Sequence, residues 1–395
     1  MASFFGAPPT NPTPAPVLGA KAAAKAVSAT SVPPCPGSHS STPLCLQPSI
    51  TITENTSEVF AVKFNPDGKF LAACCGDGAI RVFNSETGRM AYNLQRGSAV
   101  ALPSTAVKFR PDVETVKTKN VLISADALGN VEHWHMTSGK CLHSFKEEDN
   151  QIFALDFRPD ATQFATAGKD TAIRIYDEQT KQQVVKMERG MGFGPSAAPG
   201  HSNRVFAVKF HPNDHNVLIS GGWDNTIQVW DTRVGKAQRS IFGPHLCGEA
   251  LDLQGDVILT GSHRADDPLE TWDYGTGEKI SSVKIFDDGR SEPSQLYSAQ
   301  FAKASLSGYE EKPRLIACGS SGVNEARVYD MENGSCCVGV VGGMSRAVFA
   351  TDWSPKENKL AVAGGDASIR FVNVVEKGKI ETRGVTGGDE NVKVN

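Results

Sequence analysis

The stretch Val205–Gly235, VFAVKFHPNDHNVLISGGWDNTIQVWDTRVG, decides the fold. Its apolar and polar residues alternate over short runs, which is the pattern of a β-strand with one buried face. Asn, Asp, Gly and Pro residues interrupt these runs, and they are the residue types that form tight turns. The stretch therefore predicts three short antiparallel strands joined by two turns.

The same unit returns along the chain. Clear copies are VFAVKFNPDGKFLAACCGDGAIRVFNSETG from Val59, IFALDFRPDATQFATAGKDTAIRIYDEQTK from Ile152 and VFATDWSPKENKLAVAGGDASIRFVNVVEKG from Val348, and weaker copies begin at Thr105, Glu249 and Tyr297. With the stretch quoted first, they make seven copies. Repetition at a fixed period indicates one structural unit stacked on the next.

Each copy leaves room for a fourth strand before the next copy begins, such as RMAYNL at Arg89–Leu94 or KCLHSF at Lys140–Phe145. Four antiparallel strands in a unit of ~40–45 residues describe one blade of a β-propeller. No segment of useful length has the helical period, which argues against an α/β enzyme fold. The sequence therefore predicts an all-β chain with seven blades.

Alternation also assigns side chains to strand faces. In the first copy it places Phe60, Val62 and Phe64 on one face and Ala61 and Lys63 on the other.

The segment Gly200–Asp231 resembles the WD40-repeat family. It contains the Gly200-His201 pair, then Ser220 and Asp224, and ends with Trp230-Asp231. The resemblance covers residues from about 50 to 385 and implies a seven-bladed WD40 propeller. It also implies that His201, Ser220, Asp224 and Trp230 form a structural tetrad, in which indole, hydroxyl and imidazole donate in turn. We assign these polar residues to structure rather than to a catalytic triad.

Other copies depart from this pattern. The fifth has His245, Thr260, Asp266 and Trp272 and is a second candidate tetrad despite an insertion. In this family an N-terminal strand usually completes the last blade. Both Ser49–Asn55 and Lys379–Val385 are candidates for that strand, and the sequence does not choose between them.

Composition sets the domain limits. Residues 1–47 are rich in Pro, Ala, Ser and Thr and poor in aromatics, so they bury too little apolar surface to fold alone. We predict a disordered arm at 1–47, a propeller at 48–387 and a flexible tail at 388–395. The net charge is -4 over 395 residues, which offers no basic footprint for nucleic acid.

For each group of residues that could bind phosphate or metal or take part in catalysis, a structural role is the better interpretation. Gly190, Gly192 and Gly194 have no helix after them to present N–H groups to a phosphate. His133 and His135 share a strand face but lack further ligands nearby in sequence. The nine cysteines lack a paired framework, which indicates reduced thiols. We expect no catalysis, no cofactor, no metal and no small-molecule substrate.

Partner proteins are therefore the expected ligands, bound on loops that rigid blades hold in place. In this family the loops before each first strand and the turns between second and third strands share one top face. The candidate contacts there are Glu58, Lys169, Arg204, Trp223, Arg264 and Arg346. Trp and Arg are enriched at binding hot spots, so Trp223 and Arg204 are the main anchors, although the Trp223 ring could instead fold against the neighbouring blade.

Two narrower roles remain open. Leu218–Arg233 fits the box of WD40 substrate receptors of cullin-RING ubiquitin ligases, where the resemblance implies that Arg233, beside Asp231, contacts the ligase adaptor. The alternative is an architectural subunit of a cytoskeletal, ciliary or chromatin complex. Without a signal peptide pattern or an apolar run of ~18–20 residues, the sequence predicts no membrane partner. It favours the cytoplasm, with the nucleus as an alternative.

Overall fold

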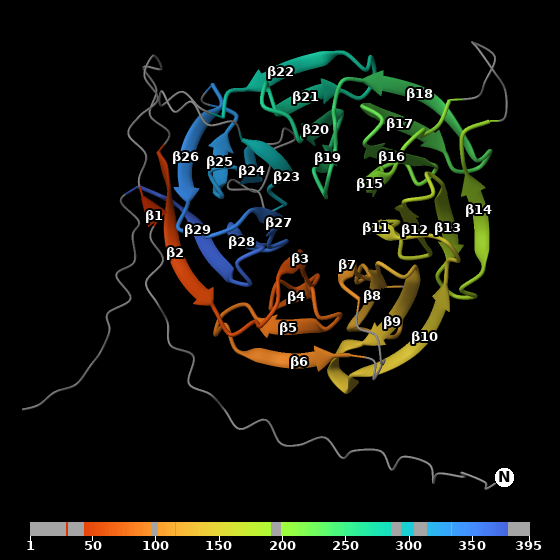
Figure 1. Ribbon diagram of the computed structural model, residues 1–395, viewed down its shortest axis with the longest axis horizontal. Helices are drawn as coiled ribbons and strands as arrows, with labels where there is room; N and C mark the ends of the chain where they lie inside the picture. Colours follow the sequence, from red (N-terminus) through yellow and green to blue (C-terminus); the bar gives the residue numbers. More distant parts are fainter. Residues whose placement is uncertain are drawn as a thin grey trace, which may run out of the picture.

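A computed structural model of the chain describes residues 29–30, 43–95, 102–114, 116–190, 199–285, 294–303, 314–332 and 334–377. Within them, seven antiparallel sheets stand around a central channel as the blades of a propeller (Figure 1). The only helical element among these residues is the 3-10 turn Met136–Ser138. The predicted all-β, seven-bladed architecture is confirmed.

The first four blades use consecutive strands in the order inner to outer. Blades 1 and 2 are β3 (Val59–Phe64), β4 (Phe70–Cys75), β5 (Ile80–Asn84), β6 (Met90–Leu94), and β7 (Ser104–Phe109), β8 (Val121–Asp126), β9 (Asn130–His135), β10 (Lys140–Lys146). Blades 3 and 4 are β11 (Ile152–Phe157), β12 (Gln163–Gly168), β13 (Ile173–Asp177), β14 (Gln183–Met187), and β15 (Val205–Phe210), β16 (Val217–Gly222), β17 (Thr226–Asp231), β18 (Lys236–Phe242).

The remaining blades are built in the same way, with two additions from the N-terminal part of the chain. Blade 5 is β19 (Leu251–Gln254), β20 (Val257–Gly261), β21 (Leu269–Asp273), β22 (Lys279–Val283). Blade 6 is β23 (Gln295–Phe301), β24 (Leu315–Ser321), β25 (Ala326–Asp330), β26 (Cys336–Val341), with β1 (Ala29–Thr30) on its outer edge. Blade 7 is β27 (Val348–Trp353), β28 (Lys359–Gly364), β29 (Ile369–Glu376), β2 (Leu44–Ile52).

The N-terminal strand closes the ring. β2 pairs antiparallel with β29 from Leu44↔Glu376 to Ile52↔Ile369, so the last blade is held by both ends of the propeller. Of the two candidate closing segments, the one before the first copy takes this place, and Lys379–Val385 lies outside the described residues. Strand β2 starts at Leu44, four residues before the predicted boundary at 48, because Leu44 is an apolar residue that the last blade buries.

The boundary of the predicted arm therefore needs correction at two places. Residues 44–47 and Ala29–Thr30 are paired strands, the latter with Val340 and Val341 of β26. An edge strand offers unpaired N–H and C=O groups, which stabilise even a low-hydrophobicity segment that reaches them. The rest of the predicted arm and the tail at 388–395 lie outside the described residues.

Removing β2 should open the ring. We expect deletion of residues 1–52 to cost at least about 3 kcal/mol of unfolding free energy, because the buried side chains of Leu44 and Ile52 are lost and the β29 edge is exposed. Deletion of residues 1–42 keeps β2 and is the control. Thermal unfolding and light scattering check this. Equal melting temperatures and monomeric behaviour for both deletions would contradict ring closure by β2.

Candidate functional site

One face of the disc gathers the loops that lead into the inner strands. We call it the top face. The turns between second and third strands lie on the same side and hydrogen-bond to those loops. The Trp223 N–H donates to the Arg204 carbonyl over 3.0 Å, and the Lys169 N–H donates to the Gln151 carbonyl over 2.9 Å. In these two blades the loop and the turn are thus held together as one unit.

The inner strands turn one residue each into the channel at this face. In blades 1, 2, 3, 4, 6 and 7 the pairing register shifts across one residue near the start of the inner strand, the third residue in blade 6 and the second in the others, which is a β-bulge. The residues at this position, with the equivalent residue of blade 5, are Phe60, Thr105, Phe153, Phe206, Glu249, Tyr297 and Phe349. A bulge re-aims a side chain away from the regular alternation. The prediction that Phe60 shares a face with Val62 and Phe64 was wrong for this reason.

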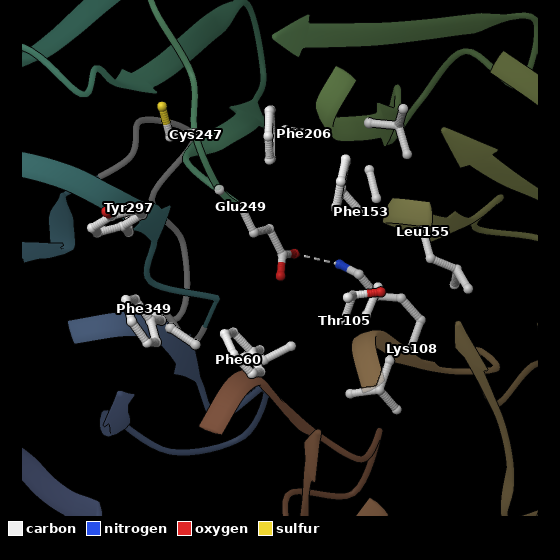
Figure 2. A pocket seen from close by; sticks show the side chains of 18 of the residues that line it. Phe60, Thr105, Lys108, Phe153, Leu155, Phe206, Cys247, Glu249, Tyr297 and Phe349 are labelled. Atoms are coloured by element: carbon white, nitrogen blue, oxygen red, sulfur yellow. Dashed lines mark hydrogen bonds and ion pairs between the residues drawn. The ribbon is translucent and has the colours of Figure 1, made fainter. Parts of the chain in front are cut away.

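These residues form the mouth of the channel (Figure 2). Phe60 stacks on Phe349 with ring centroids 5.5 Å apart, and Phe153 stacks on Phe206 at 4.7 Å. Tyr297 packs edge-on against Phe349 at 5.3 Å. All five rings are only half-buried. They line a cavity of about 340 Å³ on the channel axis.

A charged tier lies beneath the aromatic mouth. It comes from the residue three positions after each mouth residue: Lys63, Lys108, Asp156, Lys209, Asp252, Gln300 and Asp352. Lys63 contacts Asp352 at 3.1 Å, Lys108 contacts Asp156 at 3.4 Å and Lys209 contacts Asp252 at 3.2 Å. Opposite charges on adjacent inner strands therefore neutralise one another.

Glu249 reaches down from the mouth into this tier. Its carboxylate lies 2.7 Å from the Lys108 ammonium, 2.9 Å from Lys63 and 4.0 Å from Lys209. Burial alone would raise the pKa of Glu249, but the three ammonium groups outweigh it and hold the pKa below its ordinary value. Burial lowers the pKa of Lys108, against the attraction of Glu249. One carboxylate thus contacts three lysines from different blades, each of which also pairs with an aspartate of the tier.

The aspartates of the tier also bind the neighbouring blade. Asp156 accepts the backbone N–H of Phe210 over 2.9 Å, and Asp252 accepts that of Phe301 over 3.0 Å. Asp352 of blade 7 accepts the N–H of Phe64 in blade 1 over 2.7 Å. Each carboxylate fixes the spacing between two inner strands.

Trp223 and Arg204 form a platform beside the mouth. The Trp223 ring lies 5.3 Å from Phe206, its indole N–H donates to Cys247 Sγ over 2.8 Å, and the Arg204 guanidinium lies over the ring at 5.0 Å. The ring also stacks on His245 of the next blade at 6.3 Å. Of the two interpretations of Trp223, the packed ring is present, and it still leaves the side chain half-buried on the top face.

The local sequence fixes this platform. Asn225 has a φ of 58°, and Asp224 accepts the Thr226 N–H over 3.2 Å, so the turn is tight. A Cβ on Gly222 would lie 2.1 Å from the Arg204 carbonyl oxygen, so glycine is required for the turn to approach the loop.

The other predicted top-face contacts are spread around the rim. Arg346 pairs with Glu58 at 2.5 Å, joining blades 7 and 1. Arg264 is held by Glu270 at 2.7 Å and by the Gly243 carbonyl, while Lys169 is exposed. The structure brings Trp223 and Arg204 together, but it ties Arg346, Glu58 and Arg264 into ion pairs within the propeller.

The four residues of the predicted tetrad meet within blade 4. The Trp230 indole donates to Ser220 Oγ over 2.8 Å, Ser220 Oγ lies 2.6 Å from His201 Nε2, and His201 Nδ1 lies 2.8 Å from Asp224 Oδ2. Burial would raise the pKa of Asp224, but the His201 hydrogen bond lowers it. Trp230, Ser220 and His201 are buried, so no open cleft surrounds them.

The second candidate tetrad in blade 5 does not form. Trp272 donates to Thr260 over 3.0 Å, but the imidazole of His245 faces Asn225 of blade 4 at 2.7 Å instead of Thr260. The longer turn Ser262–Pro268, which includes Asp266, separates these groups.

Blade 3 contains a variant that the sequence prediction missed. Glu147 stands where blade 4 has His201 and binds the hydroxyls of Thr166 and Tyr176 at 2.5 and 2.9 Å. Its spacing of 19 residues from Thr166, equal to that between His201 and Ser220, is the signal that could have found it.

The opposite face presents the residues predicted to contact a ligase adaptor. Arg233 follows the end of β17, and its guanidinium pairs with Asp231 at 2.7 Å while the Arg233 side chain stays 68% exposed. It therefore lies on the rim away from the channel mouth.

The two histidines considered as metal ligands contact other side chains. His133 is buried against Glu178 at 3.1 Å, whereas His135 faces Ser138 at 2.7 Å. Among the described residues no group of His, Cys, Asp and Glu is arranged to hold a metal, and none of the eight cysteines described there forms a disulfide. Of the glycine-rich stretch, Gly190 alone is described. In the same part of the chain, no helix has the length and apolar character of a membrane span.

Two family models match this chain. The model described as "WD domain, G-beta repeat" matches residues 139–177 and 196–231, and the "Anaphase-promoting complex subunit 4 WD40 domain" model matches residues 49–110. The chain belongs to the WD40-repeat family. The predicted resemblance is confirmed.

Curated relatives resemble this WD40-repeat chain over part of their length. The APC/C activator protein CDC20 of Saccharomyces cerevisiae is 26% identical over 63% of this chain and 38% of the relative. Cilia- and flagella-associated protein 52 of Bos taurus is 25% identical over 58% of this chain and 34% of the relative. A guanine nucleotide-binding protein subunit beta of Zea mays is 21% identical over 73% of this chain and 70% of the relative. The matches to the first two thus span little more than a third of the relatives.

The charged tier generates a pH prediction. Because the pKa of Glu249 is lower in the folded state, its carboxylate stabilises the fold above pH 4.5, its ordinary value, and this contribution is lost as the pH falls below that value. Glu249→Gln should cost about 3 kcal/mol at pH 7, since it leaves the buried tier with one positive charge in excess, and should flatten the acid limb of the stability curve.

Urea unfolding between pH 7 and pH 3 measures both effects. Glu148→Gln, at an exposed glutamate paired with Lys146, is the matched control. If the Glu249 and Glu148 variants were equally stable at pH 7, the neutralising role of Glu249 would be wrong.

Proposed function

We propose that this chain is a non-enzymatic scaffold that holds partner proteins on the top face of its propeller, within a larger cytoplasmic complex. The half-buried Trp223 ring, with Arg204 seated on it, carries the proposal. It places the two residue types most common at binding hot spots beside an open aromatic mouth. The WD40-repeat relatives are themselves regulators or subunits, which supports a role in binding rather than in catalysis.

Rigidity is what makes the platform suitable. The Trp223 turn is held by the Arg204 carbonyl and by Asp224, which in turn belongs to the buried hydrogen-bonded chain of blade 4. A side chain that is already ordered loses little conformational entropy on binding. Contacts with the platform should therefore contribute to affinity with little loss of conformational entropy.

Trp223→Ala should weaken capture of a top-face partner by roughly thirtyfold, which corresponds to about 2 kcal/mol for a hot-spot residue. Phe242→Ala is the control. It removes another aromatic side chain, 75% exposed on the outer strand of the same blade, and should leave partner capture unchanged. Quantitative mass spectrometry of proteins co-purified with each full-length variant measures this. Wild-type recovery of every partner by the Trp223 variant would refute the proposal.

A second candidate, a substrate receptor of a cullin-RING ubiquitin ligase, draws on the exposed Arg233. Its guanidinium is oriented by Asp231 on the face opposite the mouth. An adaptor bound there would leave the top face free for a substrate. A third candidate, an architectural subunit of a ciliary or cytoskeletal assembly, draws on the cilia- and flagella-associated relatives.

Arg233→Glu should abolish recovery of the ligase adaptor while the melting temperature stays unchanged, because the side chain is exposed and packs on no core residue. Lys236→Glu makes the same charge change at an exposed neighbour and is the control. Co-purification followed by immunoblotting for the adaptor is the measurement. Equal adaptor recovery from both variants, or none from wild type, would exclude the ligase role.

A further inference from the structure

The mouth of the channel is a site of its own, distinct from the Trp223 platform. Six inner strands carry a bulge at the same position, and five of the seven residues turned inward there and in blade 5 are aromatic. A bulge interrupts the regular ladder of backbone hydrogen bonds. Its recurrence leaves large apolar rings facing a cavity instead of the core between blades (Figure 2).

Apart from the Tyr297 hydroxyl, the main polar groups around this cavity are already engaged. The Thr105 hydroxyl donates to the Ile152 carbonyl, and the Cys247 sulfur accepts the Trp223 indole N–H. The Glu249 carboxylate is shared between Lys63 and Lys108. An ionic ligand would lose its hydration here without gaining a charged partner that is not already paired.

The charges beneath the mouth balance. The tier and the groups that contact it contribute four ammonium groups, Lys63, Lys108, Lys209 and Lys303, and four carboxylates, Asp156, Asp252, Glu249 and Asp352. The floor therefore offers no net charge to attract a cationic or an anionic side chain. Charge complementarity favours an uncharged occupant.

We propose that the mouth binds one bulky, uncharged apolar side chain, such as Phe, Leu or Met, presented by a partner polypeptide. The cavity of about 340 Å³ is near the lower end of the range for ligand pockets, roughly 300–1,000 Å³, which suits a side chain. Phe206 belongs to the mouth and also contacts Trp223, so one peptide can cover both. This deepens the proposed function and rests on it for the choice of a polypeptide.

A random-peptide library displayed on phage and selected on the full chain tests the proposal. The enriched peptides should share one position restricted to Phe, Leu, Met, Ile or Trp. Enrichment of Lys, Arg, Asp or Glu at the fixed position, or no enrichment, would overturn it.

Two variants locate the binding. Thr105→Phe fills the mouth with the residue that four other copies carry at this position, and Phe153→Ser empties one wall. Both should weaken a selected synthetic peptide at least tenfold in fluorescence anisotropy, and Phe242→Ala should leave it unchanged. Circular dichroism shows whether each variant is folded. Unaltered affinity in a folded Thr105→Phe variant would place the peptide elsewhere and overturn the proposal.

Other occupants give distinct results, and each would overturn the assignment to a partner. A concentration-dependent dimer that Thr105→Phe dissociates would make a second copy the occupant. A rise in peptide affinity on changing Phe4 and Phe5 to Ala would make the N-terminal segment the occupant, because these are the only aromatics in residues 1–42.

The experiment also separates this proposal from the proposed function. If Trp223→Ala releases natural partners while Thr105→Phe and Phe153→Ser do not, the scaffold role stands and the mouth is not its anchor. If the mouth variants abolish peptide binding but no natural partner depends on Trp223, the scaffold role on the platform fails and the apolar site remains.

Discussion

The hydrogen bond from one inner strand to the carboxylate of the next is the contact on which the ring depends. Asp156, Asp252 and Asp352 each accept a backbone N–H from the following blade, and the last of these joins blade 7 to blade 1. A buried carboxylate is stable only when it is paired and hydrogen-bonded. The lysines of the same tier supply the charge, so neutralisation and blade spacing are achieved by one set of groups.

This arrangement explains why the mouth can be apolar. The charged tier lies below the mouth, and Glu249 pairs there with Lys63 and Lys108. The aromatic rings above are therefore not needed to neutralise these charges. They stack in pairs across neighbouring blades and leave a hollow on the axis.

The fold was predictable because turn residues and alternation repeat seven times, and each copy specifies the same strands. The mouth was not, because alternation alone assigned Phe60 to the face of Val62 and Phe64. A bulge has no sequence signature in one copy, although aromatics at the same position in five copies carry the signal. Ring closure by β2 was also undetermined, since two flanking segments had suitable patterns and only tertiary pairing with β29 selects one.

The tetrad was also only partly predictable from the sequence. It shows that equivalent residues have different roles in different blades. Sequence identified the residues of blade 4, but it placed His245 in a second tetrad, although that imidazole contacts Asn225 and stacks on Trp223. The histidine thus supports the platform instead of its own blade. Trp223 belongs to the turn of blade 4, which contains the complete buried hydrogen-bonded chain. Its ring also stacks on His245 of blade 5, where this chain is incomplete. A blade with the complete chain and a blade with an incomplete one therefore meet at Trp223.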